Sequence, residues 1–323
     1  MYNNEHEQIV VVKKTRKKTI ISMKRLWRKV IWGSLTLVIL LAALAFPVSM
    51  VVSHNVPKAI PSDYPQTVWA DSRIGAAIEL IEDELEIRGW ASARPNWHPQ
   101  ARLTAMPAYQ SGLTSVLSRF ANLRANLITS GSGRDEDLAL ASSLIAQAVG
   151  TSAENQLLAA TQALRRFDGL KARSVLDDEI ESTLLEGELQ LYRQILSECT
   201  EDLSRIVRSD ERGPFDLNRT ATFYKTKGRI LAIGALLHSS EEDMTNQPGF
   251  RAAYASLLEA LDLAFKPAPL FVSNPKPGSF SFGGNDVIQL AYLLNEARFR
   301  LQELDTVLHS KARPDPLTVT NRS

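Results

Sequence analysis

The apolar pattern of this chain opens with one uninterrupted hydrophobic run. Residues Val30–Val52 read VIWGSLTLVILLAALAFPVSMVV and contain no charged side chain. Because about twenty such residues cross the hydrocarbon core of a bilayer as a helix, the run predicts a transmembrane helix. Residues 1–29 before it carry nine lysines and arginines against two acidic residues.

Basic residues beside a membrane span are retained in the cytoplasm. We therefore expect a single-pass protein with residues 1–29 as a basic cytoplasmic segment and the rest of the chain on the far side of the membrane. In a bacterium this location is the inner membrane, with the main domain in the periplasm. The expected partners are the lipid bilayer, through Val30–Val52, and anionic lipid head groups, through Lys13–Lys29.

A cleaved signal peptide is the alternative interpretation of the same run. Ala43-Leu44-Ala45 has the small-x-small form of a cleavage site. However, the basic region is long and the apolar run continues to Val52, whereas the apolar core of a signal peptide usually has about 7–15 residues. We favour a retained anchor, and both interpretations export the same domain.

Proline spacing changes the pattern directly after the apolar run. Pro57, Pro61 and Pro65 stand four residues apart. Because proline fixes φ and favours extended chain, residues 53–69 are predicted to form a semi-rigid spacer between the membrane and the domain.

From residue 70 to residue 309 the apolar positions recur with the period of an α-helix, and glycine or proline separates one stripe from the next. The longest stripe runs from about Ser174 to Arg208, and the last runs from Asn285 to His309. Only Pro269–Val272 has even a faint strand pattern. We predict an all-α protein: an N-terminal transmembrane helix, then a helical-bundle-like domain of about eight helices over residues 70–309, then a disordered tail over residues 310–323.

Composition narrows the function classes. The whole chain has a net charge of +1, but removing the nine basic and two acidic residues of positions 1–29 leaves −6 for the remainder. An exported domain of this charge is not a general nucleic-acid binder. Cys199 is the single cysteine, so an intramolecular disulfide is excluded and the domain must be stabilised by its core.

One window of the domain has an unusual charge pattern. Ile87–Arg134 contains six arginines, two tryptophans and no acidic residue. Arginine binds carboxylates and phosphates, and both residue types are enriched at binding hot spots, so the window is one candidate interaction surface. The candidate residues are Arg88, Trp90, Arg94, Trp97, His98, Arg102, Tyr109 and Gln110.

The architectural alternative is at least as strong. Asp177–Glu211 carries eleven acidic residues, so the two segments could pack against each other and pair their charges. Under this interpretation the tryptophans are core residues beneath a loop. The exposure of the tryptophans and the partners of the arginines decide between the two.

The sequence offers no recognisable chemistry. It contains no His-Glu-x-x-His, no cysteine pair, no Gly-x-Ser-x-Gly and no phosphate-loop pattern. None of the five histidines follows a glutamate at the spacing of helical iron sites. We therefore predict no catalytic residue, no cofactor and no metal site.

Several short motifs occur together in an order that is similar to one known family. They are Gly89-Trp90, Met106–Leu113, Arg119-Phe120, the Gly131–Gly133 break followed by Asp135 and Asp137, and Pro269–Val272. On these motifs the chain resembles a domain-of-unknown-function family of proteobacterial single-pass inner-membrane proteins with an exported helical domain. The resemblance covers roughly residues 30–309. It implies location and fold, and it assigns no activity.

Two hypotheses of function follow from these features. The first is a non-enzymatic, membrane-tethered scaffold or adaptor that meets another envelope component, such as a protein, through the Trp90–Tyr109 region. The second is an enzyme or ligand carrier that acts on an envelope lipid or cell-wall fragment in an interhelical pocket lined by His98, Arg102, Tyr109 and Gln110.

Overall fold

The computed structural model describes residues 27–44, 55–62, 68–95, 98, 100, 104–128, 135–173, 178–209, 216–241, 250–269, 272–275 and 284–312. Within these ranges the regular structure is helical throughout and contains no strand, which confirms the all-α prediction. The chain divides into two compact units, Met1–Ser53 and His54–Ser323. Residues 45–52 of the predicted span lie outside the described residues.

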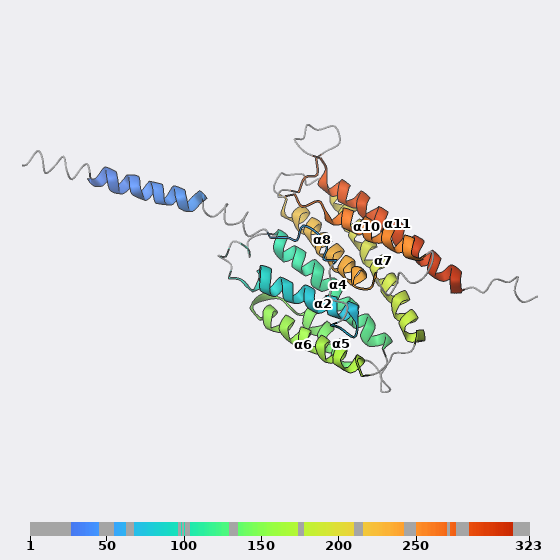
Figure 1. The fold of residues 1–323 in the computed structure, drawn as a ribbon. Coiled ribbons are helices and arrows are strands. Elements are labelled where there is room, and N and C mark those ends of the chain that lie inside the picture. The colour runs from blue at the N-terminus through green and yellow to red at the C-terminus, as the bar shows by residue number, and fades with distance from the viewer. Residues whose placement is uncertain are drawn as a thin grey trace, which may run out of the picture. The chain divides into compact units, whose positions relative to one another are not determined.

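The first unit contains the helix Trp27–Leu44, which is long and apolar enough to cross a membrane (Figure 1). Its side chains are exposed throughout. Its two hydroxyl groups are satisfied within the helix: Ser34 Oγ donates to the Ile31 carbonyl at 2.9 Å, and Thr36 Oγ1 donates to the Trp32 carbonyl at 2.8 Å. This pairing removes the main cost of placing hydroxyl groups in an apolar medium.

Eight α-helices make up the described part of the second unit, in agreement with the predicted number. They are α2 (Ser72–Asp83), α4 (Ala105–Leu127), α5 (Glu136–Ala146), α6 (Ala153–Lys171), α7 (Asp178–Arg208), α8 (Leu217–His238), α10 (Phe250–Phe265) and α11 (Asp286–Ala312). Short turns join some of them: the π-helical turn η1 (Glu84–Arg88) and the 3-10 turns η2 (Ala91–Ala93) and η3 (Gly150–Ser152).

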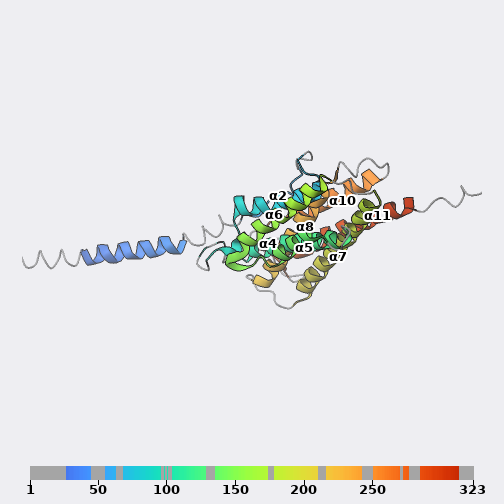
Figure 2. The ribbon, with the colours of Figure 1, turned by 90° about the horizontal axis from the view of Figure 1, so that it is seen from below.

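The second unit is built around the pair α4 and α8, which run side by side at its centre (Figures 1 and 2). Helix α5 packs on α4 and α6 packs on α5, whereas α10 packs on α8 and α11 packs on α10. Helix α2 contacts α6 and α8, and α7 contacts α4, α8 and α11. Three of the helices begin at an aspartate cap. Asp71, Asp135 and Asp216 each accept hydrogen bonds from backbone N–H groups in the first turns of α2, α5 and α8.

Two glycines set how closely α4 and α8 approach. A Cβ atom added to Gly112 of α4 would lie 2.0 Å from the carbonyl oxygen of Lys225. A Cβ atom added to Gly228 of α8 would lie 1.9 Å from the carbonyl oxygen of Tyr109. Because both obstacles are backbone atoms, the two helices contact each other main chain to main chain, and only glycine fits at these positions.

The predicted boundaries need two corrections. Val56 and Ile60 are 8% and 6% exposed, and Ile60 lies against Gly234 of α8, so residues 55–62 are part of the domain rather than of a free spacer. The spacing of the prolines predicted an extended spacer, but this segment also contains two apolar side chains, Val56 and Ile60, that gain free energy when the core buries them. In addition, α11 continues to Ala312, beyond the predicted start of the tail, and residues 313–323 lie outside the described part.

Candidate functional site

A buried polar cluster around Glu84 uses three of the candidate residues. The Glu84 carboxylate accepts hydrogen bonds from Arg88 Nη1 at 2.8 Å, from the Tyr109 hydroxyl at 3.1 Å and from Gln110 Nε2 at 3.1 Å. Burial raises the pKa of Glu84, and Arg88, Gln110 and Tyr109 act against that rise. The three residues therefore neutralise and satisfy a buried acid.

Gln110 also holds the turn that follows η1. Its Oε1 accepts from the Ala91 N–H at 2.9 Å, and its Nε2 donates to the Gly89 carbonyl at 2.9 Å. Gly89 has a φ of +70°, which favours glycine. Trp90, which follows it, is only 2% exposed. The turn is thus fixed from inside the protein.

The placement of the candidate residues corrects the prediction of one exposed surface. Trp90, Tyr109 and Gln110 are buried, and Tyr109 and Gln110 donate hydrogen bonds to Glu84. Arg94 is exposed, whereas His98 is partly buried and its Nδ1 accepts from the Gln100 N–H at 3.2 Å. Arg88 pairs with Glu84 inside its own turn. Trp97 and Arg102 lie outside the described residues.

Two arginines of the window bear out the architectural alternative. Arg119 of α4 binds both oxygens of Glu198 of α7, at 2.8 and 3.1 Å. Arg124, also in α4, lies 3.4 Å from Glu188 of α7. The arginine-rich window and the acidic helix do pack against each other and pair their charges.

Arg124 is the centre of a buried ionic network that the sequence did not reveal. Arg124 and Lys171 both form ion pairs with Asp71, and the distance from Lys171 Nζ to the Asp71 carboxylate is 2.7 Å. Arg73 forms an ion pair with Glu188 at 2.7 Å. Burial by itself would raise the pKa of Asp71, but Arg124, Arg73 and Lys171 together lower it well below its usual value. The network joins α2, α4, α6 and α7.

Lys227 is a buried basic residue outside this network. Its Nζ donates to the Pro267 carbonyl at 2.6 Å and lies 4.1 Å from the ring centroid of Phe265. Burial lowers its pKa to about 7. Tyr224, which also belongs to α8, makes a similar hydrogen bond: its hydroxyl donates to the Pro269 carbonyl at 2.5 Å. Both side chains fix the segment after α10.

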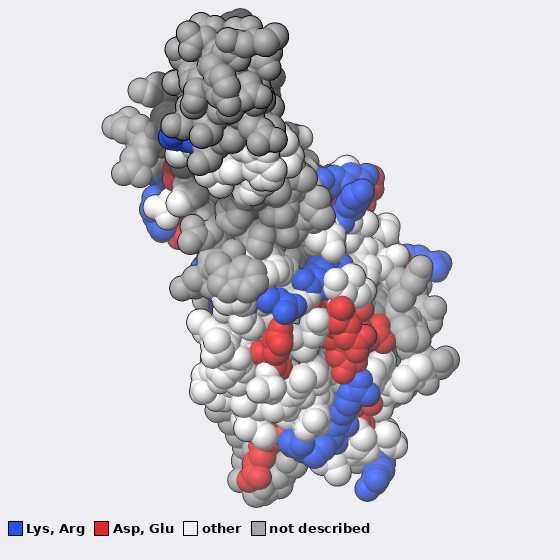
Figure 3. All heavy atoms as spheres, turned by 90° about the vertical axis from the view of Figure 1, so that its left-hand side faces the viewer, with Lys and Arg blue, Asp and Glu red and all other residues white. Residues whose placement is uncertain are grey.

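Basic and acidic side chains lie in adjacent patches on the face drawn in Figure 3. Adjacent charges of opposite sign offset each other at short range. The described part of this face therefore has no continuous basic surface of the kind that follows a nucleic-acid backbone.

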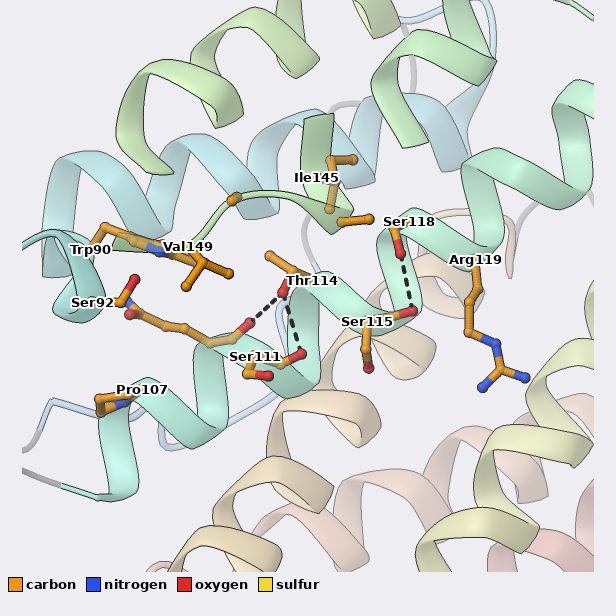
Figure 4. Close-up of a pocket in the computed structure, with 13 residues that line it drawn as sticks. Trp90, Ser92, Pro107, Ser111, Thr114, Ser115, Ser118, Arg119, Ile145 and Val149 are labelled. Carbon is orange, nitrogen blue, oxygen red and sulfur yellow. Dashed lines mark hydrogen bonds between the residues drawn. The ribbon is translucent and has the colours of Figure 1, made fainter. Parts of the chain in front are cut away.

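A groove of about 510 Å³ lies along α4, beside the chain that joins α5 to η3 (Figure 4). One wall is a face of α4 with four hydroxyl side chains at helical spacing: Ser111, Thr114, Ser115 and Ser118. The opposite wall is apolar and consists of Ile145, Ala146, Ala148 and Val149. Trp90 borders one end and Arg119 borders the other, and Gln110 is also among the lining residues.

Three of the four α4 hydroxyls, those of Thr114, Ser115 and Ser118, donate to carbonyl groups of their own helix. Thr114 donates to the Gln110 carbonyl at 3.1 Å, and Ser115 donates to the Gly112 carbonyl at 2.7 Å. Ser115 Oγ also accepts a hydrogen bond from Arg229 Nε at 3.4 Å, so each of these two oxygens keeps at least one lone pair for a ligand group that donates. The groove therefore combines hydrogen-bond acceptors with an apolar wall, and its volume is that of a small-molecule or peptide site.

Among the described residues that line the groove, Arg119 is the one ionised side chain, and Glu198 pairs with it. A hydroxyl can act as a nucleophile only when a base lies within hydrogen-bond reach. In the ranges that the structure describes, no group of three His, Cys, Asp or Glu residues is arranged to hold a metal ion. To a ligand the described lining offers hydrogen-bond acceptors, an apolar wall and one paired arginine.

No family model, curated protein or solved structure matches the chain. The resemblance to the family of envelope proteins therefore stays a prediction. What the fold and site define is a class: an all-α protein with one helix that is long and apolar enough to span a membrane, and a helical domain that carries a hydroxyl-lined groove.

Proposed function

We propose that this protein is a single-pass inner-membrane protein of the bacterial envelope, and that its domain is a non-enzymatic scaffold or adaptor in the periplasm. The observation that carries the proposal is the helix Trp27–Leu44, whose large apolar side chains are all exposed. An exposed apolar surface of this extent is costly in water and stable in a bilayer.

The charge on either side of this helix supports the orientation. Residues 1–29 carry nine basic residues against two acidic ones, and the remainder of the chain has a net charge of −6. This asymmetry favours a cytoplasmic N-terminus, with Lys13–Lys29 near anionic lipid head groups.

The orientation makes a direct prediction. Alkaline phosphatase fused after Ser323 should be active in intact cells, because this enzyme folds with its disulfides only in an oxidising compartment. A green fluorescent protein fused at the same position should stay dark if the C-terminus is exported unfolded. The opposite pattern, an inactive phosphatase and a bright fluorophore, would refute the proposed topology.

The groove supports the adaptor role and gives it a location. Trp90, which lines the groove, belongs to the Trp90–Tyr109 region that the sequence analysis proposed as the interaction surface. In the groove, however, the surface offered to a partner is the hydroxyl wall of α4 and not a set of arginines. An extended peptide of a partner protein would present backbone N–H groups to the acceptor oxygens of Thr114 and Ser115. It would also cover the apolar wall at Val149, which is 71% exposed.

A ligand carrier is the second candidate function, and the same groove favours it. A volume of about 510 Å³ accommodates a drug-sized molecule. A cell-wall fragment or lipid with hydroxyl and amide donors would use the same oxygens. The two candidates differ in the chemistry of the occupant.

Photo-crosslinking separates them. With a photoreactive phenylalanine at Ser111 in the full-length protein, we expect one discrete adduct in cells. A protein adduct supports the adaptor, and a lipid or glycan adduct supports the carrier. The control places the same group at Leu170 of α6, which is 55% exposed and does not line the groove. If the two positions give the same adducts, the groove is not a binding site.

A further inference from the structure

A second hollow lies on the outer side of α7 near its C-terminal end, where the helix faces α11. It has a volume of about 640 Å³. Ser197, Ser204 and Arg208 of α7 border it at helical spacing, and Arg298 of α11 borders it from the neighbouring helix. We call this hollow the α7–α11 trough. The serine side chains of α7 are small, so a hollow remains between the lining arginines.

Positive charge is in excess in the trough. Arg208 and Arg298 have no carboxylate within ion-pair distance among the described residues. Arg205 pairs with Asp202 at 3.1 Å, but its side chain is 75% exposed, so that pair is weak. Glu201 is the one acidic residue among the described lining residues, and three arginines against it leave a net charge of +2.

Hydroxyl donors complete the lining. Ser197 and Ser204 donate to no protein group in the part of the chain that the structure describes. The Thr200 hydroxyl, in contrast, already donates to the Leu196 carbonyl at 2.9 Å. Arginine has no acceptor atom, so the arginines and these two serines offer donors to a ligand. A ligand with several acceptor oxygens and negative charge fits such a set.

The C-terminus of α7 would repel an anion if its carbonyl groups were free. Two residues prevent this. The Ser209 N–H donates to the Arg205 carbonyl at 3.0 Å, and the Ser209 hydroxyl donates to the Ile206 carbonyl at 2.8 Å. Asn274 Nδ2 also donates to the Ile206 carbonyl, at 3.2 Å. Two of the last four carbonyl groups of α7, those of Arg205 and Ile206, are thereby occupied, which offsets part of the negative potential at this helix end.

We propose that the α7–α11 trough is a binding site for a phosphate group. The guanidinium forks of Arg205, Arg208 and Arg298 match the geometry of phosphate oxygens, and the serine hydroxyls add short hydrogen bonds. The phosphate can be carried by a soluble molecule or by the head group of an anionic phospholipid. The site is separate from the α4 groove and does not depend on the function proposed for it.

Isothermal titration of the full-length protein in a neutral maltoside detergent tests this site. The probes are inorganic phosphate and dihexanoyl phosphatidylglycerol, with dihexanoyl phosphatidylcholine as the zwitterionic control. We expect saturable binding of at least one anionic probe. Arg208→Gln and Arg298→Gln should each weaken it about tenfold, because each removes a hydrogen bond to a charged group.

The matched control is Arg193→Gln. Arg193 lies on the same helix outside the trough, and its guanidinium pairs with Asp305 at 2.9 Å. We expect this variant to bind with unchanged affinity. Because the substituted side chains are outside the core, the melting temperature of each variant should match the parent.

Binding of both anionic probes supports a site for any phosphate group, and phosphate binding alone identifies a soluble source. Binding of phosphatidylglycerol alone, lost in the trough variants, identifies a lipid head group. If neither probe binds saturably, or if Arg193→Gln weakens binding as much as Arg298→Gln, the proposal is wrong and the trough is an ordinary solvated surface.

Discussion

Replacing Arg124 by methionine should lower the free energy of unfolding by about 3–5 kcal/mol, because one partner of a buried ion pair is removed. Arg124 is completely buried and pairs with Asp71 and Glu188, which are themselves 3% and 1% exposed. After the substitution these carboxylates keep only Lys171 and Arg73 as cationic partners. Urea unfolding of the full-length protein in detergent, followed by circular dichroism, measures the loss.

The control for this variant is Arg166→Met. Arg166 pairs with Asp137 on the surface, its side chain is 52% exposed, and its loss should cost less than about 1 kcal/mol. A second variant, Asp71→Asn, keeps a side-chain oxygen to cap α2. Combined with Arg124→Met, it should cost less than the sum of the two single changes. Equal losses for Arg124→Met and Arg166→Met would mean that the network does not stabilise the fold.

Gly228→Ala should destabilise the domain by about 3 kcal/mol or more, since the added methyl group overpacks a contact between two backbones. The new Cβ atom would lie 1.9 Å from the Tyr109 carbonyl oxygen, so α4 and α8 must separate. Tyr109 donates to Glu84, so this separation should also disturb the turn at one end of the groove. A thermal melt of the full-length protein measures the change.

Gly169→Ala is the matched control for the same substitution in a helix. No atom lies within 4 Å of the position that its Cβ would take, and the residue is in α6. There alanine should stabilise the helix by up to about 1 kcal/mol. If Gly228→Ala raised the melting temperature as Gly169→Ala does, the close contact of α4 with α8 would be refuted.

The apolar period predicted the helices of the described domain, and an aspartate cap marks the start of three of them. The aspartates at 71, 135 and 216 precede apolar stripes, and each one caps the helix that the stripe predicts. The charge-free run likewise predicted the apolar helix that the structure describes over Trp27–Leu44. These signals are local. The backbone hydrogen bonds of a helix join residues four positions apart, and a capping side chain binds an N–H group two or three positions after it.

The groove could not be predicted from local sequence patterns. Its two walls come from α4 and from the chain after α5, and the sequence does not state that they face each other. The hydroxyls at 111, 114, 115 and 118 do share one helix face, which their spacing shows, but an exposed polar face has the same spacing. Only the packing of α5 against α4 converts that face into a wall.

The sequence alone determined the all-α class, the approximate positions of the helices and the presence of an apolar N-terminal helix, because these depend on contacts between near neighbours. Tertiary structure decided that Trp90 is buried and that Arg124 pairs with residues 53 and 64 positions away. It also decided that Gly112 and Gly228 join two backbones. The physical reason is that desolvation and ion pairing depend on which distant segments come together, and an apolar period does not encode that choice.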